Sequence, residues 1–243
     1  MAILDALRAH GMQPSRAVTR QTDDPRPYAA ALAALEAQNL LFTCDCSRRE
    51  IAATAGAAGT ADPCCLRDCR DRRPPAAEAA LRADLSALHP MAVADRSLSA
   101  IRFDPAQHRD VVVRRRDGIV AYALAVVVDD AEAGVTDVVR GGDLLEGTRW
   151  QLALHQALGL EPPRYLHLPV VTEADGAKLA KSRRSVPLEP GSAARNLAQA
   201  LGWLRQPVPA ALRAGDIAAG LAAAAAQWDT LRFSGMAEIR LPG

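Results

Sequence analysis

The sequence IVAYALAVVVDD at residues 119–130 opens the most informative part of this chain. It is followed by VVRGGDLL at 138–145, YLHLP at 165–169 and KLAKS at 178–182. Short runs rich in β-branched residues alternate here with one clear helical segment, which is the pattern of an α/β fold. Open α/β sheets bind ligands beyond the carboxyl ends of their strands, so polar residues near these ends are the first site candidates. They are Tyr122, Arg140, Lys178 and Lys181.

The same patterns predict the order of elements in this region. Val111–Arg114 is expected to be a strand that turns at residues 116–118 and pairs with a second strand at Ile119–Leu124. The further elements expected are a strand at Val135–Val139, a helix that begins at Asp143 and ends at Gly159, and a last strand at Tyr165–Val171.

Other polar residues in this region have a structural interpretation that competes with a functional one. Asp129 and Asp130 could be paired carboxylates for acid–base or metal chemistry, but we favour a role in capping a turn before the strand at Val135–Val139. His155 and His167 are expected to be packing or surface residues and not ligands.

The composition is that of an ordinary soluble protein. The 243 residues include 23% charged and 49% hydrophobic side chains, and the formal net charge is +1. No apolar run approaches the roughly 20 residues of a membrane-spanning helix, and the N-terminus lacks a signal-peptide pattern, so we expect a cytoplasmic protein. RNA contact would need local arginine clusters, and each candidate cluster has a solvated charged face as its alternative. The clusters lie at residues 67–73, 114–116 and 183–184.

Four of the five cysteines form two close pairs, Cys44-x-Cys46 and Cys65-x3-Cys69. Two such pairs can supply the four soft ligands of a tetrahedral zinc ion with little strain. The alternative is a set of reduced thiols without a metal. Cys64 is left over, and it could replace Cys65 as the third ligand.

The remaining segments are expected to be mostly helical. A short helix is predicted at Met1–Gln13, ended by Gly11. A turn at Gln21–Tyr28 leads to a helix with Tyr28, Leu32 and Leu35 on one face, and a strand at Leu40–Thr43 follows. The other expectations are a helix at Ala76–Leu88, an extended segment at Val93–Phe103, helices at Ala193–Leu204 and from the cap Asp216 to Gln227, and packing of these two helices through Trp203 and Trp228.

Taken in order, these motifs resemble the catalytic domain of the class I glutamyl-tRNA synthetases. The resemblance covers about Gln21 to Leu188, and KLAKS at 178–182 looks like the KMSKS loop of that family, with Ala180 where serine is usual. It implies a Rossmann-like α/β catalytic domain with a zinc-binding insertion. The division that follows is 1–43 for the N-terminal helical part, 44–75 for the insertion, 76–190 for the α/β domain and 191–243 for a helical C-terminal region.

The resemblance also implies roles for individual residues. Tyr122 and Arg140 would contact the substrate glutamate, and arginine suits a carboxylate because its donors are planar and bidentate. Lys178, Lys181 and Ser182 would bind ATP, with Lys181 meeting the negative charge of the transition state. The implied ligands of one structural zinc ion are Cys44, Cys46, Cys65 and Cys69. Magnesium would accompany ATP.

The activity implied is ATP-dependent conversion of glutamate to glutamyl-AMP. A large anticodon-binding domain is expected in a full-length glutamyl-tRNA synthetase and does not follow here, which favours the short, stand-alone branch. That branch would transfer glutamate to the queuosine base of tRNA(Asp) and act as a monomer. The HIGH signature expected near the start is missing from the sequence. The alternatives are an inactive, shortened homologue that binds zinc or RNA, a fragment of an enzyme that charges tRNA(Glu), and a purely structural zinc module.

Overall fold

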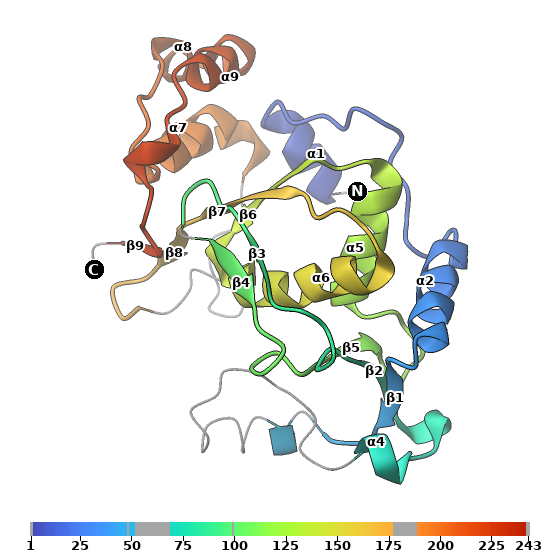
Figure 1. The fold of residues 1–243 in the computed structure, drawn as a ribbon. Coiled ribbons are helices and arrows are strands. Elements are labelled where there is room, and N and C mark those ends of the chain that lie inside the picture. Colours follow the sequence, from blue (N-terminus) through green and yellow to red (C-terminus); the bar gives the residue numbers. More distant parts are fainter. Residues whose placement is uncertain (1, 48, 52–68, 99, 177–188, 242–243) are drawn as a thin grey trace.

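The computed structural model describes residues 2–47, 49–51, 69–98, 100–176 and 189–241 (Figure 1). At its centre is a β-α-β unit. Strands β6 (Asp137–Gly141) and β7 (Arg164–Leu168) are parallel and are connected by the 3-10 turn η2 (Gly142–Leu144) and helix α6 (Leu145–Leu158). The register pairs Arg140 with His167, so both lie near the carboxyl ends of their strands. A parallel bridge from Asp95 to Tyr165 extends this arrangement beyond β7.

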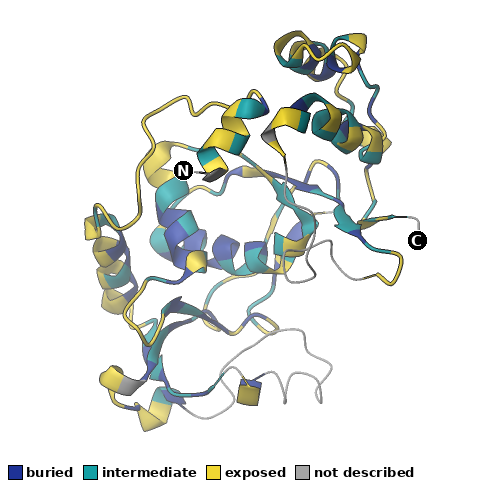
Figure 2. Ribbon diagram, turned by 180° about the vertical axis from the view of Figure 1, so that it is seen from behind, coloured by how far each residue is buried: buried dark blue, intermediate teal, exposed yellow. Residues whose placement is uncertain are grey.

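The main core lies where three helices pack together. Helices α2 (Arg26–Ala37) and α5 (Tyr122–Ala133) contact each other and α6, and Leu35, Leu124 and Leu152 are fully buried between them. Figure 2 shows the buried residues gathered in these central helices and the strands beside them, whereas α1 (Ala2–Ala9) is mostly exposed. This core fixes the helices that flank β6 and β7, and it thereby positions the ends of these strands.

A second sheet is antiparallel and has the order β1-β2-β5. Its strands are β1 (Leu41–Cys44), β2 (Ala80–Asp84) and β5 (Asp110–Arg114). A buried ion pair joins Arg82 on β2 to Asp110 on β5, because each buried charge needs a partner of opposite sign. The short helix α4 (Cys69–Arg72) packs against β1. The other elements before α5 are the 3-10 turn η1 (Ala76–Glu78) and the antiparallel strands β3 (Met91–Val93) and β4 (Ile101–Phe103).

The C-terminal region is a small helical cluster that returns to the central unit. Leu201, Leu212 and Ala224 form its core, and Leu197 and Val208 pack against it. Its last strand, β9 (Glu238–Arg240), pairs in parallel with β8 (Val170–Thr172). The elements between these strands are η4 (Pro190–Ser192), α7 (Ala193–Trp203), α8 (Ala210–Arg213), α9 (Ile217–Ala226) and η5 (Thr230–Arg232). Within the described part of the chain, no helix is long and apolar enough to cross a membrane.

Much of the predicted element order is confirmed. Helix α6 ends at Gly159, which has the left-handed φ of +67° expected of a C-cap glycine. Helix α9 begins at Asp216, whose side chain accepts a hydrogen bond from the Ala219 N–H at 3.0 Å. The structure also confirms helices α1, α2 and α7 and strands β1, β5 and β6, with ends shifted by a few residues. The proposed division of the chain into four regions stays a prediction.

The predicted strand at Ile119–Leu124 is wrong. The turn after β5 is present, with Gly118 at φ +81°, but pairing continues only through the bridge from Arg114 to Val120. Helix α5 begins at Tyr122, and it buries Leu124, Ala125, Val127 and Val128 at helical spacing. A valine-rich run is compatible with a strand or with a buried helix. Here packing against α2 and α6 stabilises the helix. Asp129 and Asp130 therefore lie near the end of a helix, where Tyr28 donates its hydroxyl hydrogen to Asp129 at 2.5 Å.

Three other predictions also need correction. The segment Ala76–Leu88 holds strand β2 and not a helix, because β2 pairs with strands on both sides and these pairings outweigh the helix propensity of alanine. The last strand is split at Pro169 into β7 and β8, as expected of a residue that cannot donate to a ladder. Trp228 packs edge-on against Phe233, and the C-terminal helices meet through leucines.

Candidate functional site

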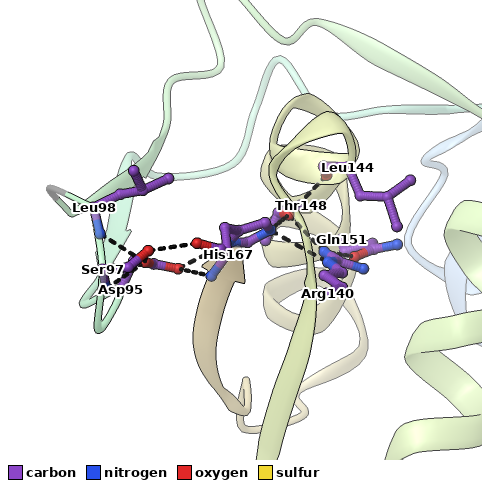
Figure 3. A network of polar contacts seen from close by, with 8 residues as sticks. All are labelled: Asp95, Ser97, Leu98, Arg140, Leu144, Thr148, Gln151 and His167. Carbon is purple, nitrogen blue, oxygen red and sulfur yellow. Dashed lines mark hydrogen bonds and ion pairs between the residues drawn. The ribbon is translucent and has the colours of Figure 1, made fainter. Parts of the chain in front are cut away.

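Arg140 lies in strand β6, which continues past the strand end predicted at Val139. It is half-buried, and three hydrogen bonds fix its guanidinium group (Figure 3). Nε donates to His167 Nε2 at 3.3 Å, and Nη2 donates to Thr148 Oγ1 at 2.5 Å and to Gln151 Oε1 at 2.6 Å. Its Cζ atom also lies 5.3 Å from the centroid of the Tyr165 ring. Among the described residues, Nη1 of Arg140 makes no hydrogen bond.

Helix α6 supplies two of the acceptors that hold Arg140. Thr148 and Gln151 are three residues apart, so they share one face of the helix, and both are buried. Thr148 Oγ1 lies 2.9 Å from the Leu144 carbonyl oxygen and 3.0 Å from His167 Nε2, so its one hydrogen can go to either of them. In both cases the oxygen accepts from Arg140. The β-α-β connection therefore places the side chains of α6 directly over the end of β6.

A buried pair of Asp95 and His167 supports the third contact of Arg140. Asp95 Oδ2 accepts hydrogen bonds from His167 Nδ1 at 2.8 Å and from the His167 backbone N–H at 3.1 Å. Its other oxygen accepts from the backbone N–H groups of Ser97 at 2.9 Å and Leu98 at 2.8 Å. We call Asp95, Arg140, Thr148, Gln151 and His167 the Arg140 network.

Electrostatics keep one member of this pair charged and the other neutral. Burial lowers the pKa of His167, and the Asp95 carboxylate only partly offsets this effect. Burial acts to raise the pKa of Asp95, but hydrogen bonds from His167, Ser97 and Leu98 outweigh it, and the pKa is lowered. At neutral pH the pair is therefore a carboxylate and a neutral imidazole.

Tyr122 lies in a different place from Arg140. It is the first residue of α5, is 56% exposed, and lines a pocket of about 740 Å³. Cys44, Cys46 and Arg116 line the same pocket. Within the described residues, Arg140 is not part of that lining. The structure thus brings Tyr122 together with the cysteines, and it places Arg140 in a separate network.

Three predicted metal ligands do come together. Cys44, Cys46 and Cys69 are buried, and their sulfur atoms all lie within 4.8 Å of one another. The Cys46 and Cys69 sulfurs are 3.8 Å apart, which is far longer than the roughly 2.05 Å of a disulfide. Tetrahedral zinc–thiolate bonds of about 2.3 Å place sulfurs roughly 3.8 Å apart, so this spacing fits a metal centre. We call these three residues the thiol cluster.

Arginine side chains connect the thiol cluster to its surroundings. Arg116, in the turn after β5, donates to the backbone carbonyls of Asp45 and Cys46. Arg72 forms an ion pair with Asp45 and lies 3.6 Å from the Cys69 sulfur. The loop that carries Cys44 and Cys46 is therefore attached to the hairpin that leads to Tyr122.

Several predicted site residues lie outside the described residues. They are Cys65 and the leftover Cys64 in one segment, and Lys178, Lys181 and Ser182 in another. The sequence reasoning also missed Asp95, Thr148 and Gln151 and took His167 for a packing or surface residue. The one available signal was a histidine inside an apolar strand, YLHLP, at a position where burial requires a polar partner.

The family described as "tRNA synthetases class I (E and Q), catalytic domain" matches residues 1–213. The chain therefore belongs to this family. Relatives named "Glutamyl-Q tRNA(Asp) synthetase" match along nearly its whole length. That of Pseudomonas aeruginosa is 40% identical over 96% of this chain and 77% of the relative, and that of Ectopseudomonas mendocina is 41% identical over 96% and 76%. The resemblance inferred from the motifs is confirmed.

Solved structures show the same fold at low identity. A glutamate tRNA ligase from Elizabethkingia meningosepticum, in complex with its amino acid, has a TM-score of 0.66 at 18% identity, over 99% of this chain and 56% of that chain. The glutamate-tRNA synthetase of Elizabethkingia anophelis has a TM-score of 0.57 at 20% identity, over 74% and 42%. The chain thus spans about half the length of these two proteins, and the mixed α/β fold of a class I catalytic domain is confirmed.

Proposed function

We propose that this chain is a ligase that activates glutamate with ATP and transfers it to the queuosine base of tRNA(Asp). In the first step a glutamate carboxylate oxygen bonds to the α-phosphorus of ATP, and pyrophosphate leaves. In the second step an acceptor on the queuosine base attacks the acyl carbon, and AMP leaves. The observation that carries the proposal is the match along 96% of the chain to relatives with this name.

Arg140 is the residue that we propose for holding a glutamate carboxylate. Its guanidinium is fixed on three sides, and Nη1 stays available among the described residues. A charge-assisted hydrogen bond from a fixed guanidinium is stronger and more selective than one from a mobile lysine. The family resemblance supports the further proposal that the Tyr122 hydroxyl contacts the glutamate, although Tyr122 lies outside the Arg140 network, at the exposed start of α5.

Lys178, Lys181 and Ser182 are proposed to bind ATP in a Rossmann-like nucleotide site, with magnesium accompanying the triphosphate. Lys181 would meet the charge that builds on the phosphates in the transition state. Lys181→Ala should therefore lower kcat by more than it raises the ATP KM, as measured by glutamate-dependent ATP–pyrophosphate exchange. Equal changes in both constants would contradict this role.

The thiol cluster is proposed to hold one structural zinc ion, with Cys65 as the fourth ligand. The three described thiols are soft donors at the spacing such an ion needs. Bound zinc would cross-link β1 to α4 and stabilise the segment between them. The arginines near this cluster make it a candidate surface for RNA, since phosphate contacts depend on grouped positive charges.

The remaining parts of the proposal concern the state of the protein in the cell. Because ATP, glutamate and tRNA are substrates found together in the cytoplasm, we propose that the protein acts there. We also propose that it acts as a monomer, which sedimentation at micromolar concentration would test.

Two assays test the function. Glutamate-dependent ATP–pyrophosphate exchange should be observed in the absence of tRNA if activation is separate from transfer. Labelled glutamate should then appear on tRNA(Asp) that contains queuosine, and not on tRNA(Asp) that lacks it. Charging of tRNA(Glu) would select the glutamyl-tRNA synthetase alternative. Absence of both exchange and transfer would select an inactive homologue.

A further inference from the structure

We propose that Asp95 and His167 are positioning residues that set the orientation of the Arg140 guanidinium. The inference rests on the proposed function, in which Arg140 binds a substrate carboxylate. His167 contacts Arg140, and Asp95 acts on Arg140 through His167. Neither residue is proposed to contact the reacting atoms.

The first step of the argument is the tautomer of His167. Asp95 Oδ2 accepts from Nδ1 at 2.8 Å, and a carboxylate can only accept, so the ring proton must lie on Nδ1. Nε2 then carries a lone pair, which faces two donors, the Nε–H group of Arg140 at 3.3 Å and the Thr148 hydroxyl at 3.0 Å. With the opposite tautomer, two N–H donors would face each other across this contact. Asp95 therefore decides whether His167 can accept from Arg140.

The second step is that Asp95 is itself held in place. Four N–H groups donate to it, namely His167 Nδ1 and the backbone groups of Ser97, Leu98 and His167, and Ser97 Oγ lies 3.2 Å from its Oδ1. Ser97 also donates its hydroxyl hydrogen to the His167 carbonyl at 2.5 Å and accepts at its own carbonyl from the Gly235 N–H at 2.7 Å. The turn at 95–98 is thus attached to β7 on one side and to the segment before β9 on the other.

The third step is the number of constraints on Arg140. Nε is held from β7, and Nη2 is held twice from α6, so acceptors on two separate elements define the plane of the guanidinium. Loss of the Nε contact leaves only Nη2 anchored, and the group can then rotate about that end. A substrate carboxylate at Nη1 would have to order the side chain on binding, which weakens its affinity.

Substitutions that separate the two hydrogen bonds of His167 provide the test. His167→Asn keeps a donor for Asp95 and removes the acceptor for Arg140, whereas His167→Gln can return an acceptor near the position of Nε2. We expect His167→Asn to raise the glutamate KM by roughly tenfold or more, the change expected for one hydrogen bond to a charged group. The ATP KM should change by less than about twofold, and His167→Gln should recover part of the loss.

His155→Asn is the matched control. His155 is as buried as His167 (2% against 1% exposed), and its Nδ1 has no hydrogen-bond partner among the described residues. This variant should lower the melting temperature without changing the ratio of glutamate KM to ATP KM. An equal rise in both constants for His167→Asn, or an unchanged glutamate KM, would overturn the inference.

A second measurement is independent of catalysis. In ¹⁵N NMR of the histidine side chains, His167 should be the neutral Nδ1–H tautomer, and Asp95→Asn should shift it toward Nε2–H and speed solvent exchange of the Arg140 Nε–H. An Nε2–H tautomer in the unaltered protein would overturn the inference, whatever the enzyme assay shows. Absence of glutamate-dependent exchange together with the Nδ1–H tautomer would instead count against the proposed function and leave the positioning geometry supported.

Discussion

The Arg140 network and the thiol cluster are assembled in opposite ways. The thiol cluster comes from short sequence motifs at the end of β1 and the start of α4, and only its fourth proposed ligand lies elsewhere in the same short stretch. The Arg140 network takes one residue from β6, one from β7, two from α6 and one from the turn at 95–98. A local cluster can be completed by a metal, whereas a dispersed network depends on the packing of the whole central unit.

Removal of the metal should have the largest effect and should affect only one of the two sites. Cys69→Ser is expected to reduce bound zinc from about one per chain to nearly none and to lower the melting temperature, because structural zinc sites contribute folding free energy directly. Metal analysis and thermal denaturation measure both. Cys64→Ser is the matched control and should keep the metal if Cys65 is the ligand. A metal-free protein with the same melting temperature would contradict the zinc assignment.

The buried ion pair between Arg82 on β2 and Asp110 on β5 gives the next largest effect. Asp110→Ala leaves the Arg82 charge buried and should cost about 3–5 kcal/mol in the free energy of unfolding. Asp117→Ala removes an exposed pair with Arg115 in the neighbouring turn and should cost less than about 1 kcal/mol. Urea denaturation compares them. Similar values for the two variants would show that the buried pair does not hold the β1-β2-β5 sheet together.

Arg140→Ala should affect ligand binding and leave the fold largely intact. We expect the glutamate KM to rise by roughly 100-fold, the upper end for loss of a charged hydrogen bond, with a much smaller change in the ATP KM. Arg164→Ala is the control, because Arg164 is exposed on the neighbouring strand and pairs with Asp137. Steady-state exchange kinetics measure both constants. Equal increases would remove Arg140 from the glutamate site.

The smallest expected effect is the contribution of His155 to the pH dependence of the free energy of unfolding. Burial lowers the pKa of His155 to about 4 in the folded protein, compared with about 6.5 when unfolded. As the pH falls through 6.5, the unfolded state binds a proton that the folded state excludes. The contribution of His155 is therefore complete above pH 6.5 and is lost progressively toward pH 4.

His155→Leu should remove the pH-dependent contribution of His155. Between pH 7.5 and pH 4.5, the free energy of unfolding of this variant should therefore fall by about 1–3 kcal/mol less than that of the unaltered chain. Urea denaturation at the two pH values gives the difference. Equal pH sensitivity of the two chains would mean that His155 takes up its proton without unfolding. A His155 that titrates in the folded state would also weaken its use as a control for His167.

The contrast between the two sites also explains what the sequence could predict. Cys44, Cys46 and Cys69 are recognisable because a metal site needs ligands at fixed, short spacings. Arg140 is predicted through its motif, but its partners are not, because Thr148 and Gln151 meet Arg140, and Asp95 meets His167, only after β6, α6 and β7 have packed. The helix at 145–158 and its C-cap at Gly159 were predictable because the signals for them, leucines at helical spacing and a glycine at the end, lie within the segment itself.

The errors come from segments in which tertiary contacts outweigh local preference. The hairpin-type turn at residues 116–118 predicts a returning strand at Ile119–Leu124 that includes Tyr122, yet helix α5 begins at Tyr122 and packs against α2 and α6. Leu81 and Ala83 looked helical by composition, yet they lie on β2 between two neighbouring strands. In both cases the elements that determine the secondary structure by packing or pairing are distant in the sequence. A short segment read by itself therefore cannot predict it.

The pairing of β8 with β9 has a practical consequence for work with shortened chains. Val170 lies opposite Glu238 and Thr172 opposite Arg240, so β9 covers one edge of β8, the short strand that follows β7. A chain cut after Gln227 would keep all three C-terminal helices and look intact by helix content. It would nevertheless expose the backbone N–H and C=O groups of β8, and an open strand edge of this kind promotes self-association.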